Sequence, residues 1–525
     1  MSGAPIRTAS QQLGRSDEDF TRNRMVPRSK KLSELLEPAV AKSLKGGLDP
    51  VVRRVAIDSR RVTLGAVFFA LPGTRIDGNA FIDEAIERGA VAVVSSRSRR
   101  FPGSKIAHVQ VEDPRKALAF AARTFFDCPD ESLSLIGVTG TNGKTTVAFL
   151  AQQMLSTAER PFGCIGTVGY DLVKRTVPSF RTTPESQDLC ELLSQAKEFA
   201  CAGALLEVSS HGIAQQRVAG LRFRVVVFLN LTRDHLDYHG DMESYFEVKT
   251  RVFTGALGPL PDVAVVNIDD PYGKRLLERI PKEVRVITFG LSKRADVRAE
   301  DIELKPDGTC FRLTERGDEF GVLVRSPLIG RYNASNVLAA ISICQALGIE
   351  FEQCIEKLDS FKGIPGRMEP VVGGQSYTVV VDYAHTEDAL KNALAMLREV
   401  TVGELKVVFG CGGDRDRGKR PAMTRVAQEL ADFCWVTSDN PRSESIEAIF
   451  EDMKEGVVAE DRIRFVSERR RAIECALKSC KQGDCLLVAG KGHESFQEYG
   501  ETVVPFDDRK VVASVISNIE LGVRD

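Results

Sequence analysis

Short apolar runs rich in Val, Ile and Phe alternate with helix-like stretches along almost the whole chain. LSLIGV at 133–138 is followed by KTTVAFLAQQMLSTA at 144–158, and the same order recurs with the later runs ALLEVSS, RVVVFLNLT, VAVVNID and VRVITFG. Continuous apolar runs of this length are typical of buried parallel strands, which need a crossover helix between neighbours. The sequence therefore predicts an α/β fold with mainly parallel sheets.

The length of the chain predicts several domains, because 525 residues exceed one ordinary hydrophobic core. The first thirty residues are polar, and we interpret 1–30 as a disordered tail. We expect a smaller α/β domain over 31–112, a large central domain over 113–363 and a third α/β domain over 364–525. The segment KGIPGRME at 362–369 is rich in Gly and Pro and predicts a hinge.

The composition argues against several kinds of partner. The net charge is −2 and no block of basic residues occurs, so we expect no nucleic-acid partner. The longest apolar runs have strand length, so we expect no membrane insertion. Twelve cysteines without a C-x-x-C pair favour reduced thiols and a cytoplasmic protein.

The segment GVTGTNGKTT at 137–146 is similar to a phosphate-binding loop with unusual spacing. The common form is G-x-x-x-x-G-K-[ST], but its first glycine would fall on Val138. The glycines lie between a predicted strand and a predicted helix, where backbone N–H groups favour an anion. Lys144 adds positive charge, and Thr145 offers a hydroxyl to Mg²⁺. We interpret the segment as a tighter nucleotide loop; the alternative is a strand–helix turn with a surface lysine.

Five of the six histidines stand in short polar motifs at predicted strand ends, namely His211, His235, His239, His385 and His493. Ligands of open α/β sheets bind at the carboxyl ends of strands. Glu207 leaves a strand toward the same edge, and with His235 it could bind a divalent metal. The alternative for each residue alone is a hydrogen-bonded loop position.

Two motifs of the third domain also follow predicted strands. GCGGDRDRGKRPAM at 410–423 carries several cations and favours an acidic ligand, unless it is only a solvated loop. In DNPRSE at 439–444, Asp439 and Asn440 can meet an ammonium, and Arg442 can clamp a carboxylate. The alternative here is a simple Asn-Pro turn.

The motifs together resemble a known enzyme family. GTNGKTT, TTPE, EVSSHG, TRDHLDYHG, GRYNASNVLAA, GIPGRME, DYAHT, GCGGDRDRGKRP, DNPRSE and AGKGHE occur in the order typical of the Mur ligase family, over residues 50 to 510. The resemblance is greatest to the members that add meso-2,6-diaminopimelate. It implies a UDP-sugar-binding first domain, a central P-loop-type ATPase domain and a C-terminal dinucleotide-fold-like domain that binds the amino acid.

The resemblance also implies the reaction. An ATP-dependent ligase would join meso-2,6-diaminopimelate to UDP-N-acetylmuramoyl-L-alanyl-D-glutamate through an acyl phosphate, in peptidoglycan precursor synthesis. The alternatives are a lysine-adding member of the family and folylpolyglutamate synthetase, or a nucleotide-gated scaffold that has lost the chemistry. Small molecules are the expected partners, and we expect a monomer.

The resemblance assigns residues to each substrate. For ATP it implies Gly140, Thr141, Asn142, Gly143, Lys144, Thr145, Thr146, Asn333, Asn336, Arg367, Asp382 and His385. For the UDP-muramoyl dipeptide it implies Ile57, Ser59, Thr74, Arg75, Ile76, Thr182, Thr183, Ser209, Gln215 and Arg217. For diaminopimelate it implies Arg415, Asp439, Asn440, Pro441, Arg442, Gly490 and Glu494.

The resemblance further implies two Mg²⁺ ions, held by Thr145, Glu207, His235 and Lys249, with Lys249 carbamylated by CO₂. The implied catalytic residues are Lys144, His235, Lys249 and Arg367. Arg442 would select diaminopimelate over lysine, because with lysine bound its guanidinium would lack a carboxylate partner.

Overall fold

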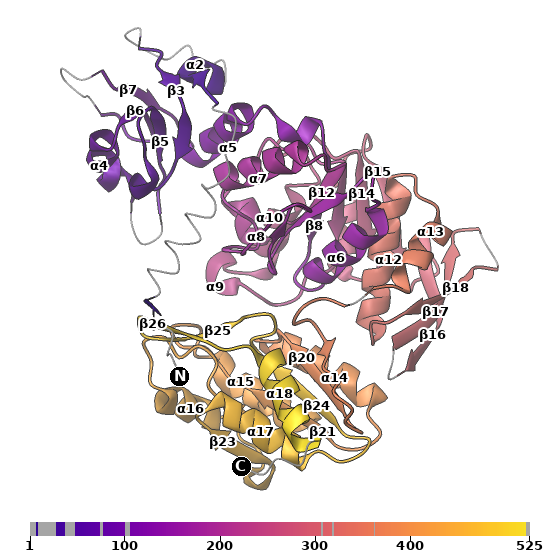
Figure 1. The fold of residues 1–525 in the computed structure, drawn as a ribbon. Helices are drawn as coiled ribbons and strands as arrows, with labels where there is room; N and C mark the ends of the chain where they lie inside the picture. The colour runs from indigo at the N-terminus through magenta and orange to yellow at the C-terminus, as the bar shows by residue number, and fades with distance from the viewer. Residues whose placement is uncertain are drawn as a thin grey trace. The chain divides into compact units, whose positions relative to one another are not determined.

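The computed structural model describes residues 7–8, 28–36, 48–73, 77–99, 105–305, 308–317, 320–361 and 363–520. The chain forms two compact units (Figure 1). The first comprises Asn23–Val297 and Ala339–Cys354, and the second comprises Met1–Arg22, Arg298–Leu338 and Ile355–Asp525. Most of the expected tail 1–30 and the predicted site residues Thr74, Arg75 and Ile76 lie outside the described residues.

A four-stranded parallel sheet forms the beginning of the first unit. Its strands, in spatial order, are β4 (Arg54–Ala56), β5 (Ala66–Ala70), β6 (Ala90–Ser95) and β7 (Ala107–Gln110). The helix α4 (Ile82–Glu87) contributes Ile82 to a small core with Phe68 and Val93. The short helix α2 (Leu32–Leu35) and the strand pair β2 (Lys30–Lys31) and β3 (Val51–Val52) precede this sheet in sequence.

The strands of the main, eleven-stranded sheet that lie in the first unit follow the order β11-β10-β9-β12-β8-β13-β14-β15. The bounds are β8 (Ser134–Thr139), β9 (Phe162–Ile165), β10 (Tyr170–Asp171), β11 (Thr176–Val177), β12 (Gly203–Glu207), β13 (Val225–Phe228), β14 (Val263–Asn267) and β15 (Arg285–Gly290). Neighbours from β9 to β15 are parallel, whereas β10 and β11 pair antiparallel. The intervening helices are α5 (Pro114–Phe125), α6 (Lys144–Leu155), α7 (Ser186–Glu198), α8 (Ser210–Ala214), α9 (Leu236–His239), α10 (Met242–Thr250) and α11 (Pro271–Leu277).

The second unit is built on a six-stranded sheet in the order β19-β20-β24-β21-β22-β23. The bounds are β19 (Glu369–Pro370), β20 (Thr378–Asp382), β21 (Leu405–Phe409), β22 (Phe433–Thr437), β23 (Ile463–Val466) and β24 (Cys485–Ala489). Every pair except β19–β20 is parallel. The helices are α14 (Glu387–Val400), α15 (Lys419–Leu430), α16 (Ile446–Lys454), α17 (Arg469–Ser479) and α18 (Asp508–Glu520).

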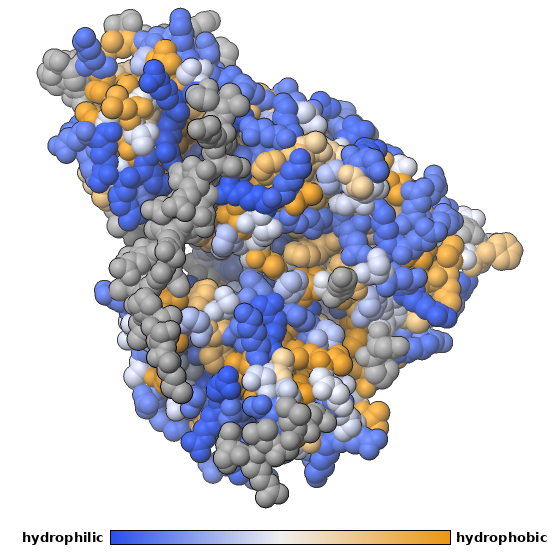
Figure 2. All heavy atoms as spheres, in the orientation of Figure 1, coloured by the Kyte–Doolittle hydropathy of each residue, from blue (hydrophilic) through white to orange (hydrophobic). Residues whose placement is uncertain are grey.

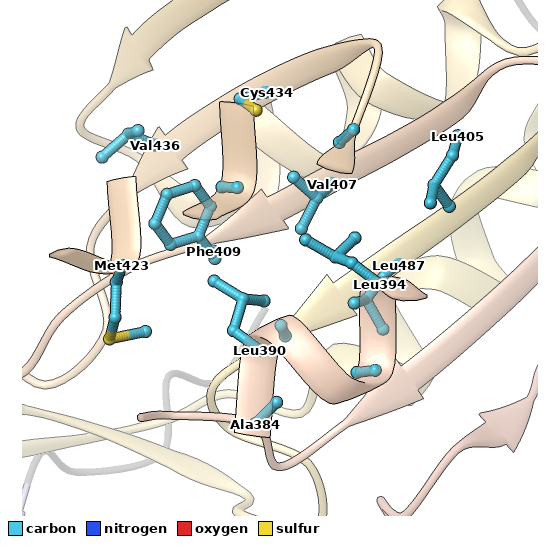
Figure 3. Close-up of a cluster of buried hydrophobic side chains, with 14 of the residues drawn as sticks. Ala384, Leu390, Leu394, Leu405, Val407, Phe409, Met423, Cys434, Val436 and Leu487 are labelled. Atoms are coloured by element: carbon cyan, nitrogen blue, oxygen red, sulfur yellow. The ribbon is translucent and has the colours of Figure 1, made fainter. Parts of the chain in front are cut away.

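Both faces of this sheet are covered by buried side chains. On one face Leu390 and Leu394 of α14 pack in a cluster with Phe409 (Figure 3). On the other face Trp435 packs with residues of α17 and α18. Strands covered on both sides must be apolar at nearly every position, which explains the continuous runs in the sequence. The predicted α/β fold with mainly parallel sheets is therefore confirmed.

The described chain contains further strands and helices. β16 (Val297–Lys305), β17 (Gly308–Glu315) and β18 (Val322–Ser326) precede the helices α12 (Arg331–Ala346) and α13 (Phe351–Leu358). The hairpin of β25 (Phe496–Tyr499) and β26 (Thr502–Pro505) also pairs with β1 (Arg7–Thr8), a short strand within the expected tail.

The face drawn in Figure 2 carries many polar side chains. On the face shown in Figure 2, hydrophobic residues are interspersed with hydrophilic ones, as is usual for proteins in water. Within the described parts of the chain, no helix has both the length and the apolar character needed to cross a bilayer.

A fully buried ion pair stabilises the second unit. The guanidinium of Arg469 donates to both carboxylate oxygens of Asp508, at 2.8 and 2.7 Å, and neither side chain is exposed. Arg469 also donates to the carbonyl oxygens of Ser438 (3.2 Å) and Ala489 (2.9 Å), at the ends of β22 and β24. One buried cation thus joins two strand ends to the start of α18.

Removing one partner of this pair should destabilise the second unit strongly. We expect Asp508→Asn to lower its free energy of unfolding by about 3–5 kcal/mol, because Arg469 would remain as an unpaired buried charge. Trp435, the single tryptophan of the chain, lies in the core beside α18, so its fluorescence during urea denaturation reports this unit.

The matched control is Glu451→Gln, which removes an exposed ion pair with Lys454 in the same unit. We expect a change below about 1 kcal/mol there. Equal unfolding midpoints for the two variants would contradict the role given to the Arg469–Asp508 pair.

Candidate active site

The loop between β8 and α6 has the geometry of an anion-binding loop. β8 ends at Thr139, α6 begins at Lys144, and Gly143 adopts a left-handed φ of 87°, which favours glycine. The ammonium of Lys144 lies over the loop and donates to the carbonyl oxygens of Gly140 (2.9 Å) and Thr141 (2.8 Å). The loop, the helix N-terminus and the cation therefore meet at one place, as phosphate binding requires.

The side chain of Asn230, a residue outside the predicted site, holds this loop through hydrogen bonds. Its side-chain oxygen accepts from the backbone N–H groups of Thr141 (3.1 Å) and Asn142 (2.9 Å). Its amide nitrogen donates to the carbonyl of Asn142 (3.1 Å). The sequence feature that could have identified Asn230 is its position as a polar residue within the apolar run RVVVFLNLT.

Glu207 lies at the end of β12, fully buried beside the loop. One carboxylate oxygen accepts from the hydroxyls of Thr145 and Thr167, both at 3.0 Å, and the other accepts from the Thr167 N–H at 2.9 Å. Gly166 lies so close that a methyl group there would overlap the carboxylate. Thr167, another residue not identified from the sequence, thus fixes the orientation of Glu207.

Lys249 on α10 is almost completely buried on the other side of the loop. Its nitrogen lies 3.1 Å from the Gly140 carbonyl and 3.3 Å from the Thr139 hydroxyl. Burial, and then the charge of Lys144, hold the pKa of Lys249 well below its usual value. The nitrogens of two lysines, Lys144 and Lys249, therefore both lie against the Gly140 carbonyl.

His235 caps α9 in a left-handed conformation, with φ 54°. Its Nε2 lies 3.3 Å from a carboxylate oxygen of Asp234, and its ring contacts that of His211 at 4.7 Å between centroids. His239 stacks on Tyr245 at 4.8 Å. The three histidines predicted at strand ends in this unit therefore cluster together.

The chemistry of these groups fits Mg²⁺ at one position. The carboxylate of Glu207 and the hydroxyl of Thr145 are hard oxygen donors in contact beside the phosphate loop, and Mg²⁺ is usually bound by few carboxylates together with substrate phosphates. Over the parts of the chain that the structure describes, no group of three or more His, Cys, Asp and Glu side chains could hold a metal by itself. An ammonium at Lys249 does not fit a dication.

The predicted muramoyl-dipeptide residues of the main sheet form one connected group. The Thr183 hydroxyl donates to the Glu207 carbonyl (2.7 Å) and contacts the Ser209 hydroxyl (3.0 Å). Arg217 donates to the Thr183 carbonyl (2.8 Å) and to Gln215 (2.5 Å). The Thr182 hydroxyl lies 3.1 Å from that of Thr167, so the group is continuous with the residues around Glu207.

Three arginines surround one carboxylate in this group. Glu185, itself nearly buried, pairs with Arg217 (3.2 Å), with Arg115 (3.5 Å) and, in a very short contact, with Arg181. Burial chiefly lowers the pKa of Arg217; the charge of Glu185 opposes this shift, and the charges of Arg181 and Arg115 add to it. The four side chains carry an excess of positive charge that an acidic ligand could neutralise.

The predicted residues of the first domain are less connected. Ser59 is buried and donates to Glu84 at 2.7 Å, while Ile57 lies between β4 and the short helix that contains Ser59. These positions lie in a different sheet from the phosphate loop.

The remaining predicted ATP residues belong to the second unit. Asn333 donates to the Ile329 carbonyl (2.9 Å), and Asn336 donates to Asn333 (3.0 Å). Asp382 is buried, which raises its pKa, and the charge of Arg367 opposes this. Arg367 stacks over the Tyr383 ring at 4.7 Å, and the exposed His385 lies 2.8 Å from the Tyr383 carbonyl.

Arg442 already has partners in this structure, which corrects the expectation that it would be unpaired without a carboxylate substrate. Its Nε lies 2.9 Å from Glu498, and its Nη1 donates to the Gly413 carbonyl at 2.9 Å. Its φ of 55° is left-handed. Arg415 and Arg442 both approach Gly412, so the structure brings the two predicted arginines together.

The side chain of Asn440 also has hydrogen-bond partners within the protein. Its oxygen accepts from Lys491 (3.1 Å) and from the Glu498 N–H (3.1 Å), and its nitrogen donates to Glu494 (3.0 Å). Lys491 is fully buried and was not among the predicted site residues. Its ammonium donates to Glu494 at 2.9 Å. The side chain of Asn440 is thus not available for an ammonium in this conformation.

Asp439 differs from its neighbour. Its Oδ2 is buried without a hydrogen-bond partner, and it points at Gly490, where a methyl group would approach it to 2.8 Å. A buried carboxylate oxygen without a donor is costly and usually has a functional reason. The predicted pair Asp439 and Gly490 is therefore in contact, and the following Pro441 leads into Arg442.

The other cations of the loop 410–423 have structural partners. Arg420 is completely buried and bonds Glu444 and Asp452, while Arg417 pairs with Asp452. These ion pairs lower the pKa of Glu444 and of Asp452 to about 2, chiefly through hydrogen bonds from Arg420 and Arg417 respectively. Of the four cations seen in the sequence, Arg415 is exposed and was the one assigned to the ligand.

Sequence profiles of one family match most of the chain. The Mur ligase middle domain matches residues 138–344, the Mur ligase glutamate ligase domain matches 366–492, and the catalytic domain of the Mur ligase family matches 51–126. A UDP-N-acetylmuramoyl-L-alanyl-D-glutamate--2,6-diaminopimelate ligase from Solibacter usitatus is 44% identical over 489 residues, which are 93% of this chain and 97% of the relative. The ligase of the same name from Geobacillus thermodenitrificans is 41% identical over 93% of this chain and 99% of its own.

Solved structures agree with these matches. A structure titled UDP-N-acetylmuramoyl-L-alanyl-D-glutamate--2,6-diaminopimelate ligase superimposes with a TM-score of 0.64 at 34% identity, over 89% of this chain and 95% of that one. Mycobacterium tuberculosis folylpolyglutamate synthase shares the fold, with a TM-score of 0.56 at 18% identity over 78% of this chain and 95% of that one.

The contact between Gly166 and Glu207 can be tested by adding one methyl group. We expect Gly166→Ala to displace the Glu207 carboxylate and lower nucleotide turnover at least tenfold, because the overlap is with the side-chain tip and not with backbone. Phosphate release from ATP measures the turnover, and circular dichroism checks that the protein is folded.

Gly169→Ala is the matched control in the same loop. Its added methyl would meet no atom closer than 3.5 Å, so we expect nearly unchanged turnover. Equal activity of the two alanine variants would contradict a role for the fixed Glu207 carboxylate.

Proposed function

The chain belongs to the Mur ligase family, and we propose that it is the member that adds meso-2,6-diaminopimelate to UDP-N-acetylmuramoyl-L-alanyl-D-glutamate, in the cytoplasmic synthesis of peptidoglycan precursors. It is an ATP-dependent ligase that forms an amide bond. The observation that carries this conclusion is 44% identity to a ligase of that name over 93% of this chain.

The reaction has two chemical steps. The D-glutamyl carboxylate attacks the γ-phosphorus of ATP, ADP leaves, and an acyl phosphate forms. The amino group of diaminopimelate then attacks the acyl carbon, and phosphate leaves from the tetrahedral intermediate while the nitrogen loses a proton. Three anionic substrates have to meet, so positioning and fixed positive charge are the main demands on the protein.

We assign the phosphates of ATP to the loop 140–143 and Lys144. The backbone N–H groups at the start of α6 and the ammonium above them would hold the β- and γ-phosphates. Thr145 and Glu207 would hold Mg²⁺ there, which when bound neutralises phosphate charge. Asn333, Asn336, Arg367, Asp382 and His385 remain proposed contacts of ATP.

Lys249 is proposed to act as a carbamate beside a second Mg²⁺, with His235 as a further ligand. Burial beside Lys144 favours the neutral amine. Its nitrogen can attack the carbon of CO₂ and then lose a proton, which forms an N–C bond and an anionic oxygen ligand. That change would place an anionic group near the Lys144 ammonium, and it would turn the Lys249 side chain into a donor suited to Mg²⁺.

The dipeptide substrate is assigned to Thr182, Thr183, Ser209, Gln215 and Arg217, with Ile57, Ser59 and 74–76 on the uridine and diphosphate side. The contacts of Thr183 with both Ser209 and the Glu207 carbonyl support this assignment, because they join the proposed dipeptide site to the proposed metal site.

Diaminopimelate is assigned to the ends of β22 and β24. We propose that Asp439 accepts from an ammonium of the substrate, because its Oδ2 is the buried oxygen without a donor. Asn440 and Lys491 would position Glu494, which would accept from an ammonium of the substrate as Asp439 does. Arg415 and Arg442 would bind the distal carboxylate, with Gly490 beside the site.

The carbamate predicts a chemical rescue. Lys249→Ala should nearly abolish turnover, because the proposed metal ligand is lost, and a short carboxylic acid such as acetate should partly restore it. Phosphate release in the presence of all three substrates measures both effects.

Arg367→Ala is the control for this rescue, since we expect weaker use of ATP and no response to acetate. Full activity of Lys249→Ala in CO₂-free buffer would exclude the carbamate.

The proposed choice of diaminopimelate predicts how kcat/KM depends on the amino-acid substrate. The unmodified enzyme should use meso-diaminopimelate in preference to L-lysine, and Arg442→Ala should lower kcat/KM for diaminopimelate ten- to hundredfold. The lost hydrogen bonds to a charged group are worth about 1.5–3 kcal/mol. Because Arg442 already has partners in the protein, we expect a smaller loss of kcat/KM than for a site with an unpaired buried charge.

A panel of amino acids with ATP and the UDP-muramoyl dipeptide provides the measurement, and binding of ADP to Arg442→Ala controls for the fold. Equal kcat/KM for lysine and diaminopimelate in the unmodified enzyme would favour the lysine-adding alternative.

A further inference from the structure

The hairpin of β25 and β26 holds the segment 438–442 from one side. The amide of Gln497 donates to the Asp439 carbonyl (2.8 Å) and to the Ser438 hydroxyl (3.2 Å). The next residue, Glu498, donates its N–H to the side chain of Asn440 (3.1 Å). Successive residues of β25 therefore bond successive residues of the segment that carries the proposed diaminopimelate contacts.

The backbone of Arg442 is held by the same hairpin. Its N–H donates to the Glu498 carbonyl (3.0 Å), its carbonyl accepts from Gly500 (2.6 Å), and it forms a parallel bridge with Tyr499. These contacts matter because Arg442 has a left-handed φ of 55°, which costs free energy for a residue other than glycine. The hairpin supplies the bonds that keep this conformation.

The side chain of Glu498 then fixes the guanidinium. Its Oε2 lies 2.9 Å from Nε of Arg442, while the Gly413 carbonyl accepts from Nη1 at 2.9 Å. An ion pair at Nε and a hydrogen bond from Nη1 therefore hold the guanidinium from two sides. A guanidinium has about five N–H donors, so donors of Nη1 and Nη2 remain for a carboxylate approaching end-on.

We propose that Glu498 is a positioning residue for amino-acid specificity: it orients Arg442 so that the distal carboxylate of diaminopimelate meets a prearranged fork. This inference rests on the proposed function. Glu498 keeps its ion pair with Nε while the substrate binds the other edge of the guanidinium. A competing possibility is that Glu498 only occupies Arg442 and repels the substrate carboxylate, and the two ideas predict opposite signs.

The test compares Glu498→Ala and Glu498→Gln in the full-length enzyme. Glu498→Ala removes the ion pair with Nε but leaves the backbone hydrogen bonds of residue 498, so we expect kcat/KM for meso-diaminopimelate to fall about tenfold or more. Glu498→Gln retains an oxygen acceptor of nearly the same shape and should stay within about threefold of the unmodified enzyme. KM for ATP and kcat/KM for L-lysine, which lacks the distal carboxylate, should change little in either variant.

A double-variant cycle separates action through Arg442 from a general effect on the fold. In the Arg442→Ala background, Glu498→Ala should cause no further loss with diaminopimelate. Glu501→Ala, on the exposed end of the same hairpin, is the matched control and should leave all rates unchanged.

Several results would overturn the proposal. Unchanged or raised kcat/KM for diaminopimelate in Glu498→Ala would show that Glu498 is dispensable or a competitor. An equal loss in Glu498→Gln would show that its charge matters and not its position, and a further loss in the Arg442→Ala background would place its action elsewhere. If the unmodified enzyme does not use diaminopimelate at all, the proposed function fails, and that result is visible before any variant is made.

Discussion

Parallel pairing of β8 with β12 on one side and β13 on the other is the constraint on which the first unit depends. In this register Glu207 lies opposite Val138, and Phe228 lies opposite Thr139, so the three strands end at the same level. The polar residues that follow them must then share one edge of the sheet. That is how Lys144, Glu207 and Asn230, which are far apart in sequence, come to surround one loop.

The second unit uses the same arrangement with an added buried charge. β21 separates β22 from β24, so the segments after these two strands are not direct neighbours in the sheet. Arg469 bonds the carbonyl of Ser438 after β22 and that of Ala489 at the end of β24, and Asp508 neutralises it. The proposed contacts Asp439 and Gly490 come directly after the residues held in this way.

The sequence was sufficient for the strands and for the positions of the polar motifs. Apolar runs such as LSLIGV became buried parallel strands, and the histidines of EVSSHG and TRDHLDYHG, which were expected at strand ends, lie close together. These predictions succeeded because burial on both faces leaves a continuous apolar run, and because the ends of parallel strands share an edge.

The partners of the site residues could not be predicted in the same way. Thr167, Asn230, Lys491 and Glu498 lie in segments without a motif, or inside one that was assigned to another residue, and only the folded chain brings them to Glu207, the loop, Glu494 and Arg442. A sequence pattern reports which side chains are polar, but hydrogen-bond partners far apart in sequence depend on register and on loop conformation. For the same reason the pairing of Arg442 with Glu498 replaced the unpaired arginine expected from DNPRSE alone.

The arginines around Glu185 have a consequence for the rate at which substrates are captured. Arg115, Arg181 and Arg217 outnumber their one carboxylate, and Arg181 is half exposed to solvent. An exposed excess of charge raises the encounter rate with an oppositely charged ligand, and dissolved salt screens it over about 8 Å at physiological ionic strength. A UDP-linked peptide carries several negative charges, whereas diaminopimelate carries balanced charges at neutral pH. Ionic strength would therefore slow the arrival of one substrate and leave that of the other nearly unchanged, so the order in which the two fill the enzyme would depend on the salt around it.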